Sequence, residues 1–263
     1  MDAPYIMNST NWLGIRTLYY REVRRFTKVW NQTLMAPVIT TLVWLAILTL
    51  ALGGRRGGGV EAIPFNEFVA PGLIMMTVMQ NAFANTSSSL MLSKIQGVIV
   101  DLLMPPFTAN EMTFCLMAGG VTRGVCVGLM TGIAIAFFVP LEFTHPFHAA
   151  FYLVMSAMTL ALLGMIGGIW AQGFDQMNSL NSYLITPLSF LSGTFYSVSI
   201  LPGVWETLSH YNPFFYMIDG LRYGLTGYHD GSISTGIILL IVLNSLLWFT
   251  ARQMIKTGWR LRT

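Results

Sequence analysis

Charged residues are scarce in this chain, and their scarcity excludes most soluble folds. Only 10% of its 263 residues are charged, while 54% are hydrophobic. Soluble domains carry about 25% charged residues, and the mean hydropathy of +0.61 agrees with the deficit. A chain this apolar cannot cover its surface with polar groups. The composition therefore predicts an all-α integral membrane protein, because helices satisfy their own backbone hydrogen bonds in lipid.

Signatures of nucleotide binding and hydrolysis are also missing. The dipeptide Gly-Lys does not occur, so the chain has no P-loop to cradle the phosphates of a nucleotide. Neither HExxH nor Gly-x-Ser-x-Gly is present. We therefore expect no catalytic residue, no enzymatic activity and no cofactor bound by this chain.

Cysteines and histidines give little support to a disulfide or a metal site. Cys115 and Cys126 lie in one apolar segment, about 16 Å apart along a helix, which is too far for a disulfide. The histidines lack the spacing of metal ligands, so no metal is predicted. They are His145, His148, His210 and His229.

A basic amphipathic helix is predicted over residues 12–30. Its apolar residues recur at steps of three and four and share one face: Trp12, Ile15, Tyr19, Val23, Phe26 and Trp30. Its cations share the opposite face: Arg21, Arg24, Arg25 and Lys28. This pattern is typical of a helix that lies in the membrane interface with its cations toward anionic headgroups.

Six apolar segments follow, each long enough to cross about 30 Å of hydrocarbon. They cover about residues 33–53, 68–91, 113–139, 148–171, 178–200 and 234–251. Residues 201–232 are too polar for a full span and too aromatic for a free loop. There we expect two short helices, beginning at Pro202 and Pro213, that re-enter the outer side of the membrane.

The distribution of lysine and arginine predicts the orientation. With six spans, both basic ends and Lys94 lie on one side, and only Arg55, Arg56 and Arg222 lie on the other. Since cytoplasmic loops carry the excess of these residues, both termini are expected in the cytoplasm. The stretch KIQGVIVDLLMPPFTANEM at 94–112 is then cytoplasmic too, and residues 94–104 are expected to form a short helix that the Pro-Pro pair ends.

Two features inside the spans could serve packing or function. Four glycines recur at four-residue steps and let another helix approach closely, either within the chain or from a second copy: Gly120, Gly124, Gly128 and Gly132. Polar groups at membrane depth must face protein or water. The candidates to line a transport pathway are Gln80, Asn81, Asn85 and Arg123. For these groups the sequence leaves structural and pathway roles open.

The order of elements resembles the membrane subunit of type 2 ABC (ABC-2) exporters over nearly the whole chain. The most specific matches are KIQGVIVDLLMPPFTANEM and NPFFYMIDGLRYG at 212–224. The resemblance implies one transmembrane domain over 1–263, similar to bacterial drug and polysaccharide export permeases of the inner membrane. Its implied partners are a second copy of the chain, membrane lipids and an ATPase dimer that binds ATP and magnesium. No nucleic-acid partner is expected.

The resemblance also implies roles for individual residues. Those implied for coupling to the ATPase are Lys94, Gly97, Asp101, Leu102, Leu103, Pro105 and Pro106. Those matching the outer segment of the family are Asn212, Pro213, Gly220 and Arg222. The implied function is export of a hydrophobic or amphipathic substrate, such as a drug, a lipid or a lipid-linked glycan.

Two other classes are the alternatives. An ion-driven secondary transporter usually shows inverted repeats and acidic residues in broken helices, and neither is visible here. An intramembrane lipid-modifying enzyme would need several titratable groups at membrane depth, where the sequence offers only Arg123.

Overall fold

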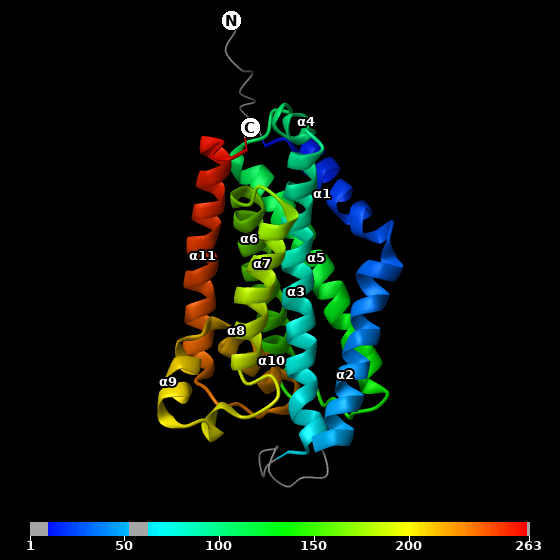
Figure 1. Cartoon of the computed structure of the whole chain (residues 1–263), viewed down its shortest axis with the longest axis vertical. Helices are drawn as coiled ribbons and strands as arrows, with labels where there is room; N and C mark the ends of the chain where they lie inside the picture. The colour runs from blue at the N-terminus through cyan, green and yellow to red at the C-terminus, as the bar shows by residue number, and fades with distance from the viewer. Residues whose placement is uncertain (1–9, 53–62, 262–263) are drawn as a thin grey trace, which may run out of the picture.

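The computed structural model of the chain describes residues 10–52 and 63–261, and within these ranges it contains helices and no strands. The helices form an elongated bundle (Figure 1). The short helix α4 and the end of α11 lie at one end, here called the α4 end, and α9 lies at the other, here called the α9 end. The glycine-rich stretch with Arg55 and Arg56 lies outside the described residues.

The helices and their bounds, in chain order, are α1 (Trp12–Thr27), the π-helix η1 (Asn31–Met35), α2 (Ala36–Leu52), α3 (Phe65–Ile95), α4 (Ile99–Leu103), α5 (Ala109–Ala136), α6 (Pro146–Trp170), α7 (Phe174–Leu180), the π-helix η2 (Asn181–Ile185), α8 (Thr186–Leu191), the 3₁₀-helix η3 (Val198–Ile200), α9 (Gly203–Tyr211), α10 (Pro213–Thr226) and α11 (Ile233–Thr257).

Helix α3 is the centre of the bundle, because it packs against α5 and α6 along most of its length and also against α2 and α10. Small residues make this close packing possible. On α6, a side chain at Gly164 would collide with the backbone oxygen of Phe83 on α3. A Cβ at Gly168 would lie 3.1 Å from the backbone oxygen of Ser87, a looser contact than at Gly164. These two glycines of α6 thus lie where its backbone comes close to that of α3.

Local signals explain where several helices begin and end. α5 starts with a capping box, in which Thr108 Oγ1 accepts from the Glu111 amide and Glu111 Oε2 accepts from the Thr108 amide. α10 has Pro213 at its first turn and ends at Gly227, whose φ of 76° favours glycine. These ends are encoded locally and do not depend on distant contacts.

Four helical segments are long and apolar enough to cross a membrane: 31–51, α5, α6 and α11. They correspond to the predicted first, third, fourth and sixth spans. α3 covers the predicted second span but is not among the four, because amides and hydroxyls crowd its middle. The predicted fifth span, 178–200, is wrong in its bounds. Its helical run covers 174–191 as α7, η2 and α8, and the chain then turns at Gly193, whose φ is 71°.

Helix α1 descends along α5 from the α4 end (Figure 1). The Asn11 amide donates to Glu111 Oε1 at 2.9 Å, and the Tyr19 and Thr122 hydroxyls are 2.8 Å apart. The predicted helix of 12–30 ends at Thr27. These contacts hold α1 against α5, and the chain then continues through η1 into α2.

The face of α1 that packs against the protein differs from the predicted apolar face. Its buried residues are Leu18, Glu22 and Phe26, while Trp12 and Trp30 are exposed. The difference arises from tertiary packing, because Gly119 of α5 has no side chain and leaves room for that of Glu22. The carboxylate is thereby drawn into the bundle.

Candidate functional site

The predicted coupling helix over 94–104 is divided into two helices. α3 continues to Ile95, the chain turns through Gly97, whose φ is 70°, and α4 then covers Ile99–Leu103. A side chain at Gly97 would be strained by this backbone conformation. Leu103 is the last residue of α4, and Pro105 and Pro106 follow within three residues.

The exposed surface of α4 mixes apolar and acidic groups. Val100 and Met104 are exposed, as are Asp101 and both prolines. Ile99 and Leu102 are buried. The apolar residues of this stretch are split between two environments, because Ile95 and Val98 are exposed. The glycine turn rotates α4 relative to α3 and causes the split.

Lys94 is bound to its own chain at the end of α6. Its Nζ donates to the carbonyl oxygens of Ile169 at 2.8 Å and Ala171 at 2.6 Å. Arg260 donates to the neighbouring Trp170 carbonyl at 2.9 Å. Cations stabilise helix C-termini because the last carbonyls lack partners within the helix. Lys94 therefore joins the end of α3 to the end of α6.

The polar residues of α3 lie beside two cavities. A cavity of about 410 Å³ is lined by Gln80, Asn81 and Ser88 of α3 and by residues of α7 and η2. A second, of about 310 Å³, lies between α2, α3 and α8 and is lined by Gln80, Asn81 and Trp44. Gln80 and Asn81 border both cavities, so they occupy the side of α3 that α2 and α8 flank.

The structure brings three of the four candidate pathway residues into one polar cluster. Arg123 Nη2 donates to Asn81 Oδ1 at 3.0 Å. Asn85 is fully buried, and Arg25 Nη2 donates to its backbone oxygen at 2.6 Å. The same Arg25 nitrogen is 3.3 Å from Glu22 Oε2. Gln80 lies apart from these contacts.

Sequence reasoning missed Glu22 and Arg25 as members of this cluster. The available signal was the four-residue spacing of Leu18, Glu22 and Phe26, which places the carboxylate on the same helix face as two apolar residues. Treating α1 as a surface helix hid this signal.

The glycine row of α5 faces helices of the same chain. A Cβ at Gly120 would be 2.8 Å from the side chains of Ala161 and Thr86. At Gly124 it would lie 3.0 Å from Ala82, and at Gly128 2.4 Å from Val78. Gly132 is less confined, with its nearest atom, in Ile74, at 3.8 Å. Three of the four positions thus seat α5 against α3.

At the α9 end, residues 201–232 contain two short helices, α9 and α10, that start at the predicted prolines. Asn212 caps α10, since its Oδ1 accepts from the Phe214 amide at 3.1 Å. Its Nδ2 donates to the Leu188 carbonyl at 2.9 Å and so ties α10 to α8. Gly220 lies against the Tyr152 ring, where a Cβ would approach to 2.3 Å.

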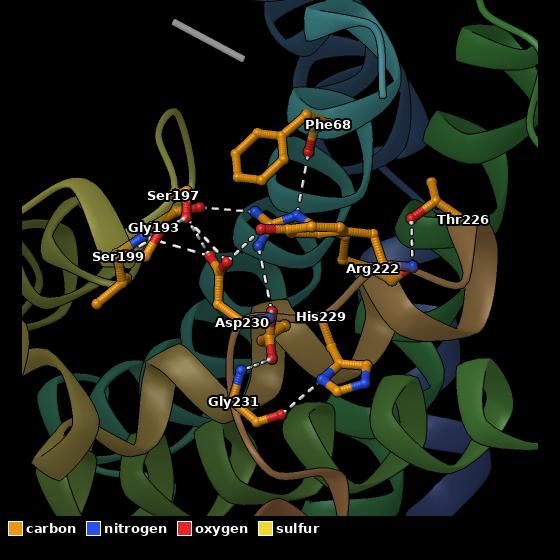
Figure 2. Close-up of polar contacts among 12 residues, drawn as sticks. Phe68, Gly193, Ser197, Ser199, Arg222, Thr226, His229, Asp230 and Gly231 are labelled. Atoms are coloured by element: carbon orange, nitrogen blue, oxygen red, sulfur yellow. Dashed lines mark hydrogen bonds and ion pairs between the residues drawn. The ribbon is translucent and has the colours of Figure 1, made fainter. Parts of the chain in front are cut away.

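Arg222, which the sequence analysis counted among the cations on the side opposite the basic ends, is fully buried. Figure 2 shows its contacts. Its Nη2 donates to the Gly193 carbonyl at 2.6 Å and its Nε to the Phe68 carbonyl at 3.2 Å. The guanidinium lies 3.9 Å from the centre of the Phe68 ring. Arg222 therefore joins α10, the start of α3 and the turn after α8.

Two carboxylates that the sequence analysis overlooked complete this network. Asp219 pairs with Arg222 at 3.4 Å and accepts from the amides of Asp230 and Gly231, both at 2.9 Å. Asp230 accepts from Ser197 Oγ at 2.8 Å and from the Tyr228 hydroxyl. Burial and the bond to Asp230 raise the pKa of Tyr228 to about 12, so its hydroxyl stays a donor at neutral pH.

Comparison with known proteins agrees with this architecture. Residues 14–226 match the ABC-2 type transporter family. The chain is 35% identical to the inner membrane transport permease YadH of Escherichia coli (strain K12), over 96% of this chain and 98% of the relative. It is 25% identical to nodulation protein J of Rhizobium leguminosarum bv. viciae, over 92% of this chain and 93% of the relative. It is 22% identical to nodulation protein J of Sinorhizobium fredii (strain NBRC 101917 / NGR234), over 95% of this chain and 94% of that relative.

These matches define the class of the protein. The chain belongs to the ABC-2 type transporter family, and it is a membrane protein with several apolar helices. Its relatives named as permeases indicate a transport subunit.

Proposed function

We propose that this chain is the permease subunit of an ATP-driven exporter and that a separate ABC ATPase drives it. The family and the permease names of its relatives support this role. The substrate class is hydrophobic or amphipathic: a drug, a lipid or a lipid-linked glycan. The chain itself hydrolyses nothing, and ATP and magnesium bind to the partner.

The observation that carries the proposal is the exposed surface of α4. Val100 and Asp101 of the five-residue helix α4, and Met104 directly after it, are exposed at one end of the bundle. A short exposed helix with apolar and acidic side chains suits a groove on a partner protein. Ile99 and Leu102 anchor it to the bundle.

Movement of α4 would be transmitted to α3 and α6. α4 follows α3 through the Gly97 turn, and Lys94 connects α3 to the last turn of α6. Closure of the ATPase dimer around ATP would shift α4 and bias α3 and α6 between two arrangements. The cavities beside Gln80 and Asn81 are the proposed substrate path, shared with a second copy of the chain.

The proposed setting is the bacterial inner membrane with six crossings and both termini in the cytoplasm. In this arrangement α3 and the α7–η2–α8 run complete the set of spans, and α9 and α10 re-enter the membrane from the opposite side. The α4 end then faces the cytoplasm, where ATP is available. Exposed apolar side chains on α2 and α11, such as Ile39, Val43, Val242 and Phe249, would contact lipids.

Co-purification with candidate ATPase subunits tests the proposal. Met104→Glu places a charge at the end of α4, whereas Phe143→Glu does so in the loop between α5 and α6, toward the α9 end; these side chains are 75% and 65% exposed in the wild type. We expect Met104→Glu to reduce both ATPase capture and permease-stimulated ATP hydrolysis at least about tenfold, since a charge in a docked apolar contact is costly.

Phe143→Glu should leave both readouts unchanged, and both variants should unfold at the wild-type temperature because neither position is buried. Failure of every candidate ATPase to associate with the wild-type chain would overturn the proposal. So would equal capture by the two variants.

A further inference from the structure

Polar side chains of α1, α3 and α5 converge on one cluster within the bundle, here called the basic cluster: Arg25, Asn81, Asn85, Ser88 and Arg123. Arg25 Nη1 donates to Ser88 Oγ at 3.0 Å, and its Nη2 donates to Asn85 Oδ1 at 3.1 Å. Arg123 reaches Asn81 from α5. Asn81, Asn85 and Ser88 follow steps of four and three, so they share one face of α3.

Positive charge exceeds negative charge in the basic cluster. Glu22 is the carboxylate that pairs with it, at 3.3 Å from Arg25 and 3.1 Å from Arg21. Glu22 is fully buried and also accepts from Ser89 Oγ. Arg123 forms no ion pair with any residue that the structure describes. A cation within a helix that can cross a membrane is costly unless an anion neutralises it.

Hydrogen-bond donors in the basic cluster also exceed its acceptors. Arg25 Nε, Arg123 Nε and Asn85 Nδ2 are buried and find no acceptor among the described residues. Glu22 Oε2 is a neighbouring acceptor without a hydrogen bond, but it already lies 3.3 Å from Arg25 Nη2 as an ion pair. Arg25 occupies the amide oxygen of Asn85, so the free Nδ2 faces α5 beside Gly119. Each unused buried donor costs free energy. Unpaired donors together with an excess of positive charge favour the binding of an oxyanion.

A ligand can reach the basic cluster from outside. The Arg25 side chain is 28% exposed, and Asn81 and Ser88 line the cavity of about 410 Å³. Arg123 belongs to α5, which is apolar enough to cross a membrane. The molecules around such a helix are lipids, and their phosphates lie at the membrane interface. Ser88 lies seven residues before the end of α3, so a headgroup would enter the basic cluster from the α4 end.

We propose that the basic cluster binds the phosphate headgroup of a membrane lipid. Two guanidinium groups suit phosphate because their planar donor forks match its oxygen atoms. The inference requires only that the chain resides in a membrane, and it stands independently of any ATPase partner. A soluble phosphate carries the same chemistry, and the experiment separates the two sources.

Native mass spectrometry of the purified full chain in a neutral detergent tests this site. The probes are dioleoylphosphatidic acid, dioleoylglycerol, which has the same acyl chains without phosphate, and inorganic phosphate. We expect the chain to retain phosphatidic acid and to release dioleoylglycerol. Arg25→Gln and Arg123→Gln should each weaken phosphatidic acid binding about tenfold or more. Arg16→Gln, at an exposed position of α1, should not.

Thermal unfolding without added lipid separates binding from a structural role. Arg123→Gln removes a cation that lacks an anionic partner, so it should unfold at the wild-type temperature or above; a structural arginine would lower that temperature. If the variant does not fold, Arg123→Lys keeps the charge, loses the donor fork and should still bind more weakly than the wild type.

Equal retention of phosphatidic acid and dioleoylglycerol would overturn the proposal, as would wild-type affinity in every arginine variant that folds. Stabilisation of the wild type by inorganic phosphate to the same degree as by phosphatidic acid would overturn the lipid assignment and leave a site for a soluble anion.

Discussion

At the scale of single residues, the buried side chain of Arg222 joins several segments at the α9 end. It contacts Gly193, Asp219 and the ring and carbonyl of Phe68, which belong to segments far apart in the sequence. A buried guanidinium is tolerated because each of these contacts offsets part of its lost hydration. This network fixes the start of α3 relative to α10.

Arg222→Met should therefore lower the free energy of unfolding by about 3–5 kcal/mol, because it leaves Asp219 buried without its cation. Thermal unfolding in detergent measures the loss. The double variant Asp219→Asn/Arg222→Met should be less destabilised than the sum of the single variants, since it removes both charges. Arg16→Met is the control at an exposed position and should behave as wild type. Wild-type stability of Arg222→Met would contradict this account of the network.

At the scale of elements, the packing of α5 against α3 depends on the absence of side chains. Gly120, Gly124 and Gly128 leave no room for a Cβ, whereas Gly132 does. The glycines are evenly spaced in the sequence, but only the first three lie in close contact with neighbouring helices.

Gly120→Ala should lower the free energy of unfolding by about 1–3 kcal/mol, because the new methyl group collides with Ala161 on α6 and Thr86 on α3. Gly132→Ala is the matched control and should be neutral or slightly stabilising, since the same gain in helix propensity meets no collision. Chemical unfolding of the purified chain in detergent compares them. Equal stabilities for the two variants would show that the row does not hold α5 against α3.

At the scale of the whole molecule, the two ends of the bundle carry different chemistry. The α4 end exposes a short helix next to the end of α11, and the α9 end holds a buried ionic network (Figures 1 and 2). The proposed topology places these ends on opposite sides of the membrane.

Cysteine labelling tests that topology in a chain in which Cys115 and Cys126 are replaced by alanine. Met104→Cys and Tyr211→Cys introduce exposed thiols at the α4 and α9 ends. A membrane-impermeant maleimide should label Tyr211→Cys in intact spheroplasts and Met104→Cys only after permeabilisation. Labelling of both from the same side would exclude an odd number of crossings between them, and the reverse order would invert the orientation.

The sequence by itself was sufficient to place most of the long helices approximately, because their signals are local. Long apolar runs marked the four segments that can cross a membrane, and proline and asparagine marked the starts of α9 and α10. The fifth predicted span was extended too far, to residue 200, since its aromatic and aliphatic residues continue beyond the turn at Gly193.

Only the tertiary structure decided which polar residues are buried together. Glu22 and Arg222 look like surface charges in sequence, yet both are fully buried, because α5 and α3 supply room and hydrogen-bond partners for them. The glycine row likewise had two possible partners until α3 was seen against it. Helix formation depends on neighbours a few residues apart, whereas burial of a charge depends on groups up to 154 residues away, as between Arg222 and Phe68.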